Sequence, residues 1–483
     1  MPRRYAFGAA VALLATVAAG WLAASAAPVA ETKYLTFQIF TYSGSSDPDE
    51  ATAFPPSAEI AKFVKDVVAT IGTTGDKRHK LGFNAGPLAF NNTDDQIRAL
   101  IRESFKIALE KDVAVSFHLD DSIFWSRRKD LTNDIANVEW LDWNKTPSTG
   151  RRLDWSETPT KSAPMMCLNS PAIRKAVAQR AKLIGAEIQK GTDILARSGK
   201  SELFAGVTAG WETMIGRDFA TGRDVGYCAL SNRGFSAKNP PKDADGELVK
   251  VVKEFIELWA VELARAGVAK EKIYAHIAFT PQGFESDRKT SYLRSVGFAP
   301  PEVAFSGHYR PGFSTYPIPG TFEAIYAEVA KRGSPAWISA EGTNVIPNGW
   351  PGEATMETYL GRMFNHGAVM VDIFSWGIGG EAERTRNIFR LATENKEAIG
   401  AYRKFLSGGA LEEREQPAGV FSPARFRGKI ERIQKEAPVW ARKRGSDAEI
   451  RPLMEKLDGL IKQSKFLEAD KQADAILALI ATK

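Results

Sequence analysis

Short runs of apolar, β-branched and aromatic residues alternate with helix-like segments along most of this chain, and the alternation limits the folds it can adopt. Each run has the length of a buried strand and ends abruptly at polar residues. The segments between the runs carry apolar residues at helical spacing. The runs lie at residues 34–40, 80–84, 113–119, 203–212, 272–279, 303–309, 336–341 and 369–376.

Eight strands that alternate with helices predict an α/β fold, a (β/α)8 TIM barrel, over residues 31–410. A doubly wound open sheet is the alternative that the same alternation allows. The first strand is not followed by a glycine-rich phosphate loop, which argues against the nucleotide-binding forms of such a sheet. The Gly-x-Ser-x-Gly elbow of serine hydrolases and the His-Glu-x-x-His motif of zinc proteases are also absent.

The two ends of the chain predict segments outside the barrel. Arg3 and Arg4 precede an apolar run that ends in small residues, so residues 1–26 are predicted to be a cleaved signal peptide. An uncleaved membrane anchor is the alternative, because the run is nearly long enough to span a bilayer. Residues 411–424 are polar with two prolines and predict a linker, and residues 425–483 predict a helical C-terminal appendage.

Composition and the predicted signal peptide limit where the protein is expected to act and which classes of partner it is expected to bind. Export by a bacterium to the periplasm or the medium fits best, with no membrane attachment after cleavage. The formal net charge is +6, but Lys and Arg are spread along the chain, so no nucleic-acid partner is predicted. Cys167 and Cys228 are the two cysteines, and they either form a disulfide or stay separate buried thiols. No cofactor is predicted, and the oligomeric state is not defined by the sequence.

Polar and aromatic side chains recur at the ends of the predicted strands, where barrel enzymes place their active sites. Glu212 ends the fourth strand and Glu341 the seventh. Other strand ends carry Asn84, His118, Asp120, Asp121, Trp211, His308, Tyr309 and Trp376. A single acid at such a position is more often a cap or an ion-pair partner. Two acids on separate strands, accompanied by His-Tyr and Trp, favour a functional site.

Glutamates after strands four and seven of an eightfold barrel resemble the retaining glycoside hydrolases of the large clan GH-A, which includes many cellulases, mannanases and galactosidases. The resemblance implies that Glu212 is the acid/base and Glu341 the nucleophile. It also implies that Tyr309 hydrogen-bonds the nucleophile, with His308 nearby, and that Trp376 forms a sugar platform. It covers residues 34–406 by architecture but only short motifs by residue.

The chemistry of glycoside hydrolysis requires this kind of carboxyl pair. One carboxyl protonates the leaving oxygen while the other attacks or stabilises the cationic centre, and retaining enzymes hold the two about 5–5.5 Å apart. Tryptophans in the long insertion at 122–168 suit stacking on the C–H face of a sugar, with local packing of the loop as the alternative. They are Trp125, Trp140, Trp143 and Trp155.

One position departs from the clan, which usually has Asn before the acid/base. Trp211 stands there, so Asn84 or His118 takes the contact with the sugar 2-hydroxyl, or the substrate differs at that hydroxyl. The departure keeps open a non-catalytic barrel that binds glycans. A further alternative is a metal-dependent hydrolase that uses His118, Asp120 and Asp121, although recognition of sugar hydroxyls by these residues is preferred because no further cluster of ligands is evident.

Overall fold

The structure is a computed structural model, and most of the chain after residue 30 is described in it. The described residues are 31–40, 57–119, 122–150, 163–218, 220–278, 299–318, 320–345, 355–374, 376–377, 388–413, 423–445, 447–462 and 465–481. The predicted signal peptide, Asp120, Asp121 and Trp155 lie outside them. Among these residues no helix is long and apolar enough to cross a membrane.

Eight parallel strands form one sheet in the order β5-β4-β3-β2-β1-β8-β7-β6. Their bounds are β1 Lys33–Phe40, β2 His79–Leu88, β3 Ala114–Leu119, β4 Phe204–Ala209, β5 Ile273–Ala275, β6 Gly312–Ser314, β7 Trp337–Gly342 and β8 Ala368–Ile373.

The two outermost strands of that order also pair with each other. The N–H of Ala275 donates to the carbonyl of Arg310, and the N–H of Ile277 donates to that of Gly312. The N–H of Ser314 donates back to the carbonyl of Ile277. These bonds close the sheet and confirm the predicted (β/α)8 barrel; the open sheet is excluded because it would leave both edges unpaired.

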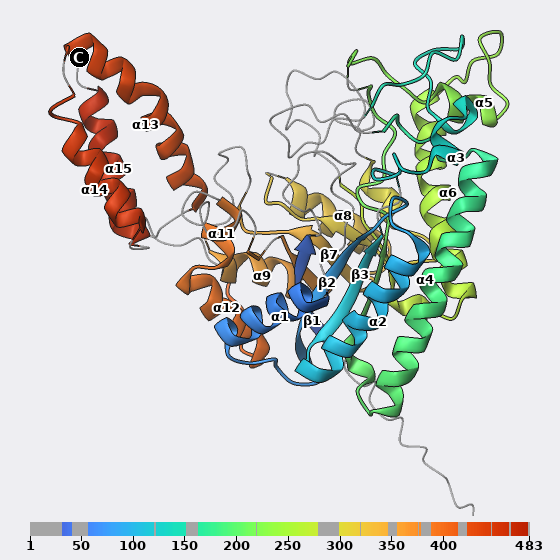
Figure 1. The fold of residues 1–483 in the computed structure, drawn as a ribbon, viewed down its shortest axis with the longest axis horizontal. Coiled ribbons are helices and arrows are strands. Elements are labelled where there is room, and N and C mark those ends of the chain that lie inside the picture. The colour runs from blue at the N-terminus through green and yellow to red at the C-terminus, as the bar shows by residue number, and fades with distance from the viewer. Residues whose placement is uncertain are drawn as a thin grey trace, which may run out of the picture. The chain divides into compact units, whose positions relative to one another are not determined.

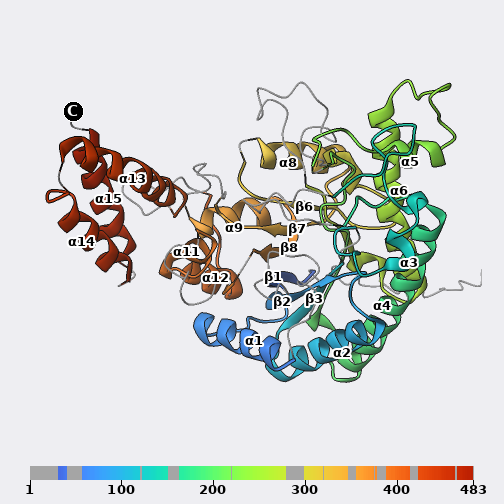
Figure 2. The same ribbon diagram turned by 45° about the horizontal axis from the view of Figure 1, so that its top comes forward.

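Amphipathic helices cover the outside of the strands (Figures 1 and 2). In α6, Val251, Phe255 and Trp259 repeat at helical spacing and are buried. The helices of the barrel region are α1 Ser57–Ile71, α2 Asp94–Lys111, α3 Lys129–Thr132, α4 Pro171–Arg197, α5 Tyr227–Asn232, α6 Ala244–Arg265, α8 Thr321–Lys331, α9 Met356–Phe364, α11 Ile388–Thr393 and α12 Lys396–Leu406. Strands and helices therefore bury one continuous hydrophobic layer between them.

The lumen of the barrel changes from apolar to polar along the strands. Near the N-terminal ends, apolar side chains form a separate cluster: Tyr34, Ala114, Ala205, Tyr274, Ile338, Ala340, Val369 and Met370. Alternate residues of a strand share a face, so Thr36 and Gln38 follow Tyr34 into the lumen along β1. Both are fully buried. The apolar cluster is thus the floor on which the polar residues lie.

The predicted sixth strand at residues 303–309 is wrong. A 3-10 turn, η4 (Pro301–Ala304), begins this segment, and β6 begins only at Gly312. The buried Val303 and Phe305 contribute to the hydrophobic layer without strand pairing, which explains the misleading apolar pattern. β6 itself has three residues and begins with glycine, because a Cβ there would lie 2.0 Å from the carbonyl oxygen of Ala275.

The C-terminal region is helical, as predicted. It contains α13 Pro423–Arg444, α14 Arg451–Lys462 and α15 Phe466–Ala481. Ile433, Leu457 and Ile476, one from each helix, belong to a hydrophobic cluster distinct from that of the barrel. The domain boundaries proposed from the sequence remain predictions.

Cys167 and Cys228 are free thiols and both are buried. The disulfide alternative is therefore not the arrangement found. Each thiol donates to a nearby oxygen instead, Cys167 to Oδ1 of Asn169 and Cys228 to the carbonyl of Ala136, both at 3.4 Å. Burial raises the pKa of Cys167, and the neighbouring Cys228 and Glu139 act in the same direction, so its neutral thiol form is stabilised.

The described tryptophans of the long insertion serve local packing. Trp125 and Trp140 are buried, and their indole N–H groups donate to the carbonyls of Pro164 and Ile135. Trp143 packs edge-on against Tyr227. These contacts match the packing alternative rather than stacking on a sugar.

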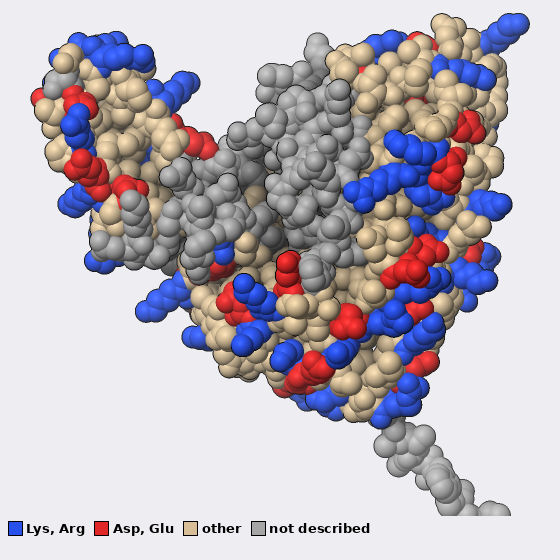
Figure 3. All heavy atoms as spheres, viewed as in Figure 1, with Lys and Arg blue, Asp and Glu red and all other residues tan. Residues whose placement is uncertain are grey.

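Charged side chains of both signs are interspersed on the face shown in Figure 3. Ion pairs between neighbouring turns occur on the helices, such as Arg98–Asp95 on α2 and Lys190–Glu187 on α4. Charges of both signs are thus mixed on the part of this face that the structure describes.

Closure of the barrel predicts a sharp cost at Gly312. A Gly312→Ala variant places its Cβ against the backbone of β5, where neither strand can retreat without breaking the closing hydrogen bonds. We expect a loss of about 1–3 kcal/mol in the free energy of unfolding, measured by urea denaturation. Gly307→Ala is the control, since a Cβ there meets no atom within 4 Å. Equal stability of the two variants would contradict this account.

Candidate active site

Glu212 lies just beyond the C-terminal end of β4 in a strained backbone conformation. The chain turns through Gly210, with φ +89°, and Glu212 itself has φ +52°. A non-glycine residue in this region costs roughly 1–3 kcal/mol and persists only where its surroundings fix it. Here the hydroxyl of Ser314 donates to Oε1 of Glu212 at 2.7 Å, and Glu212 is only 6% exposed. Strain combined with a buried contact makes Glu212 a candidate functional residue.

Two histidines extend this contact across the lumen. Nε2 of His276 lies 2.7 Å from Oγ of Ser314, and its Nδ1 lies 3.0 Å from Nε2 of His118. Nε2 of His118 also lies 3.1 Å from the carbonyl oxygen of Gly210, just before the strained turn. The hydrogen-bond chain thus returns to the segment that carries Glu212.

Burial keeps both histidines neutral and so fixes the direction of the chain. It lowers the pKa of His118 to about 3 and that of His276 well below its ordinary value, with repulsion from His118 adding to the second shift. Each ring therefore carries one N–H. Because the Ser314 proton goes to Glu212, Nε2–H of His276 donates to Ser314, and its Nδ1 accepts from Nε2–H of His118. The hydrogen-bond donors all point toward Glu212.

A buried carboxyl group lies at the other end of the network. Nδ2 of Asn84 donates to Oδ2 of Asp372 at 2.5 Å and lies 3.5 Å from Nδ1 of His118. Oγ1 of Thr36, the register partner of Asp372 on β1, donates to Oδ1 at 2.7 Å. Burial raises the pKa of Asp372 from 3.8 to about 7, and the two hydrogen bonds only partly offset that effect.

Glu341 reaches the rim of the barrel because β7 contains a bulge. Both neighbouring strands show a register shift just before this residue, so β7 holds one residue more than its partners there. Ser339 faces α9, where its hydroxyl meets that of Tyr359. Strict alternation would turn Glu341 to the same side. The extra residue resets the alternation, and Oε1 of Glu341 accepts a hydrogen bond from the hydroxyl of Tyr316 at 2.9 Å.

The end of β6 joins the two glutamates. Ser314 is the register partner of Glu341 and the hydrogen-bond donor to Glu212. The adjacent Thr315 donates its N–H to the carbonyl of Glu341 at 2.8 Å. Residues 314–316 therefore contact both acids, and the structure brings the strand-four and strand-seven glutamates to the same part of the rim.

Gln38 adds an amide to the lumen above the Thr36–Asp372 contact. It is fully buried and is the register partner of Asn84. Neither its Nε2 nor its Oε1 has a hydrogen-bond partner among the described residues, and the same holds for Oδ1 of Asn84. Buried amides without partners are costly, so such groups favour a ligand that supplies both donors and acceptors.

Several residues predicted from the sequence meet in this site. Asn84, His118 and Glu212 belong to the network, and Glu341 lies at its edge. Trp211 stacks on His118, with ring centroids 4.2 Å apart and an interplanar angle of 11°. The tryptophan that replaces the expected asparagine thus supports a histidine of the network.

Other predicted residues lie elsewhere. The hydroxyl of Tyr309 donates to the carbonyl of Val303, and His308 is exposed, because both belong to the segment that was mistaken for a strand. The indole of Trp376 donates to Asp66 of α1 and packs edge-on against Phe37. It therefore lies between sheet and helix, which does not match the predicted sugar platform. Asp120 and Asp121 lie outside the described residues.

The sequence reading missed Ser314 and Tyr316 because both depend on where β6 begins. His276 and Asp372 lie inside apolar runs, where a polar residue is by default a satisfied buried group. The signal that could have identified His276 and Asp372 is the alternation of faces along a strand, since each stands two positions after an apolar residue of its own run, Tyr274 or Met370, and shares that residue's face.

The described residues contain no group of three or more His, Cys, Asp or Glu side chains placed to hold a metal ion. Both ring nitrogens of His118 already face hydrogen-bond partners, which leaves neither directed at a metal. The two aspartates of the metal-dependent alternative, Asp120 and Asp121, lie outside the described residues.

Comparison with known proteins gives no family for this chain. No family model matches, and no curated protein matches. The catalytic domain of a β-amylase from Paenibacillus polymyxa aligns with 80% of this chain and 100% of its own, at 8% identity and a TM-score of 0.43. A β-glycosidase from Thermosphaera aggregans aligns with 80% of this chain and 99% of its own, at 11% identity and a TM-score of 0.38. With TM-scores this low, neither likeness carries an argument about activity.

The raised pKa of Asp372 predicts a pH dependence of stability. Because the folded pKa of about 7 lies above the unfolded value of 3.8, its contribution is fully present at low pH and is lost as the pH rises through the folded pKa. The expected slope is a decrease of up to about 1.4 kcal/mol per pH unit in that window. Asp372→Asn should flatten it.

The measurement is urea unfolding at several pH values between about 4.5 and 7.5. The exposed Asp95→Asn serves as the control and should keep the wild-type slope. A slope identical in wild type and Asp372→Asn would rule out a titrating, buried carboxyl at this position.

Proposed function

We propose that this protein is a glycoside hydrolase with Glu212 as the acid/base and Glu341 as the nucleophile. The observation that supports this most is the pair of strand-terminal glutamates that contact the end of β6, one through Ser314 and the other through Tyr316. Cleavage of a glycosidic bond requires two carboxyl groups with different roles at one place. The two acids here have different surroundings, a neutral histidine chain for one and a tyrosine for the other.

In the proposed mechanism, Glu341 attacks the anomeric carbon while its Oε1 is held by Tyr316. The bond to the leaving oxygen breaks as Glu212 delivers its proton there. The Ser314 hydroxyl occupies Oε1 of Glu212, so the transferred proton is carried on Oε2. Glu212, then ionised, removes a proton from water, and that water releases the sugar from Glu341 with overall retention.

The lumen network supplies the second requirement, recognition of sugar hydroxyls. The buried amides of Gln38 and Asn84 offer a donor and acceptors that have no partner among the described residues. A hydroxyl group both donates and accepts, so it satisfies such amides. Carbohydrate is therefore the proposed substrate class. The predicted signal peptide extends the proposal to action in the periplasm or outside the cell.

The test uses purified protein with a panel of glycans and aryl glycosides. Glu212→Gln and Glu341→Gln should each lower kcat/KM by about 10²–10⁴-fold or more, because each removes a group that acts on the reacting atoms. The control is Glu262→Gln, which lies on α6 and pairs with Arg265. Activity that survives in either site variant would end the assignment. Tight glycan binding without any product would favour the non-catalytic alternative.

Rescue of alanine variants with azide distinguishes the acid/base from the nucleophile. In Glu341→Ala, azide attacks the anomeric carbon once, and the glycosyl azide should have inverted configuration. In Glu212→Ala, azide attacks the glycosyl-enzyme after a first displacement, and the product should retain its configuration. The reverse pattern would exchange the two roles, and the configuration is read by NMR.

A tyrosine pair tests the corrected position of β6. Tyr316→Phe removes the hydrogen bond to Glu341 and should lower kcat by about 10- to 100-fold. Tyr309→Phe removes a hydroxyl that contacts only the backbone at Val303, so stability can fall while kcat is unchanged. Steady-state kinetics on both variants give the answer. A larger loss of kcat at Tyr309 than at Tyr316 would restore the original sequence-based assignment.

A further inference from the structure

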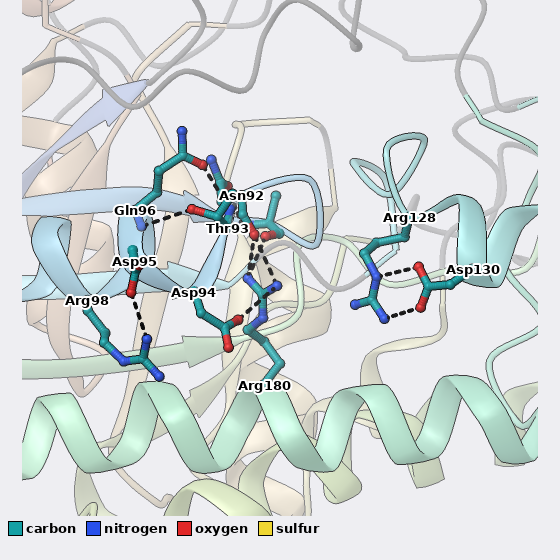
Figure 4. Close-up of polar contacts among 10 residues, drawn as sticks. Asn92, Thr93, Asp94, Asp95, Gln96, Arg98, Arg128, Asp130 and Arg180 are labelled. Carbon is teal, nitrogen blue, oxygen red and sulfur yellow. Dashed lines mark hydrogen bonds and ion pairs between the residues drawn. The ribbon is translucent and has the colours of Figure 1, made fainter.

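A second cavity, of about 530 Å³, lies beside the ends of β2 and β3, between the segments that follow these strands and helix α4 (Figure 4). None of its lining residues belongs to the lumen network. The lining residues are Phe90, Asn91, Asn92, Thr93, Asp94, Gln96, Arg127, Arg128, Ala176, Gln179 and Arg180.

Hydrogen bonds fix the walls of this cavity. Asn91 joins the two loops, since its Nδ2 donates to Ser126 at 2.9 Å and its Oδ1 accepts from the N–H of Arg127 at 2.7 Å. Arg180 reaches from α4 and donates to the carbonyls of Ala89 and Asn92 at 3.0–3.1 Å. It is only 7% exposed. The cavity is therefore preformed rather than a gap between independent loops.

Two guanidinium groups meet at the ring of Phe90. The Cζ atoms of Arg180 and Arg128 lie 5.7 and 5.9 Å from its centroid. Burial lowers the pKa of Arg180 to about 10, and repulsion from Arg128 acts in the same direction against the attraction of Asp94. Two cations at one buried ring are stabilised by an anion placed between them.

The ion pair with Asp130 uses two of the three guanidinium nitrogens of Arg128. Its Nε and Nη2 donate to the two carboxylate oxygens of Asp130, at 2.8 and 2.6 Å. The remaining nitrogen, Nη1, points away from Asp130 toward the side where Arg180 lies (Figure 4). The ion pair with Asp130 thus holds the guanidinium of Arg128 with Nη1 directed across the cavity.

Three arginines line the cavity. The carboxylate among its lining residues, that of Asp94, is 57% exposed and lies 3.6 Å from Arg180, while Asp130 pairs with Arg128 from outside the lining. Asp94 is the first residue of α2, and the preceding Thr93 forms a reciprocal capping pair with Gln96. The cap is complete without Asp94, so this carboxylate can be neutralised without loss of the helix cap.

We propose that this cavity binds an acidic sugar unit, one that carries a carboxylate or sulfate group, at a site separate from the lumen. Arginine forks match the oxygens of such groups and bind them with charge-assisted hydrogen bonds. The volume is in the range of small-molecule sites and exceeds that of a single oxyanion. Asn, Gln and Thr side chains provide partners for hydroxyls. That the ligand is a saccharide rests on the proposed function; that it is anionic rests on the cavity.

Binding is tested by calorimetry with three trisaccharide probes on the full-length protein: a uronate oligomer, a sulfated oligomer and a neutral glucan. Glu212→Gln is used throughout so that no probe is cleaved. At least one acidic probe should bind about tenfold or more tightly than the neutral one, with affinity that falls as salt rises. Whichever acidic probe binds identifies the group. Equal affinity for acidic and neutral probes would overturn the proposal, as would tighter binding of inorganic sulfate than of either acidic oligomer.

Variants locate the binding. Arg127→Ala/Arg128→Ala should weaken the acidic probe by about tenfold or more, and Asp94→Asn should strengthen it several-fold because it removes the competing carboxylate. Arg98→Ala is the matched control. It removes an arginine of α2, the helix that begins at Asp94, and Arg98 pairs with Asp95 outside the cavity. Arg180 is left intact because it holds two backbone carbonyls. No change in Asp94→Asn and in the double variant together would refute the site.

The two proposals fail separately. Arginine-dependent binding of an acidic oligomer, without cleavage of any glycan by wild-type protein, supports this cavity and removes the proposed hydrolase. Cleavage that depends on Glu212 and Glu341, with affinity for acidic probes unaffected by Arg127→Ala/Arg128→Ala, does the opposite.

Discussion

The site depends on the backbone hydrogen bonds that close the barrel between residues 273–277 and 310–314. Without them Ser314 does not meet His276, and the chain from Asp372 to Glu212 is interrupted. They also place Tyr316 beside Glu341. β6 has only three residues, and its first residue must be glycine for the strands to approach. The hydrogen bonds that close the barrel therefore also assemble the candidate site.

Burial then determines the chemistry of the lumen. A neutral histidine has one N–H donor and one acceptor nitrogen. In a row of such rings, the hydrogen bonds must therefore all run in the same direction. Here the direction runs toward Glu212. At the far end, the carboxyl of Asp372 is accommodated by donors on two neighbouring strands. A network of this kind fixes side-chain positions without placing a permanent charge in the interior.

The sequence predicted the architecture and five residues of the candidate site because those depend on local patterns. Apolar runs with polar ends identify strands, and the five residues lie at or near the predicted ends of strands that were correctly located: Asn84, His118, Trp211, Glu212 and Glu341. The errors arose where two kinds of burial look alike. Val303 and Phe305 are as apolar as strand residues, yet they are not paired in the sheet. The sixth strand was therefore misplaced, and the contact with Glu341 was assigned to Tyr309 although Tyr316 makes it. The ion pair between the half-buried Arg128 and the exposed Asp130 is not revealed by any periodicity.

The bulge in β7 makes the candidate site sensitive to insertions and deletions in this strand. The direction of Glu341 depends on strand length as well as on residue identity, because one residue fewer before it would restore strict alternation and turn the carboxyl toward α9. A single deletion before Glu341 is therefore expected to redirect its carboxyl without changing the identity of any residue of the candidate site. Comparison of residue identities alone does not detect a change of this kind, because it lies in the number of backbone residues in the strand.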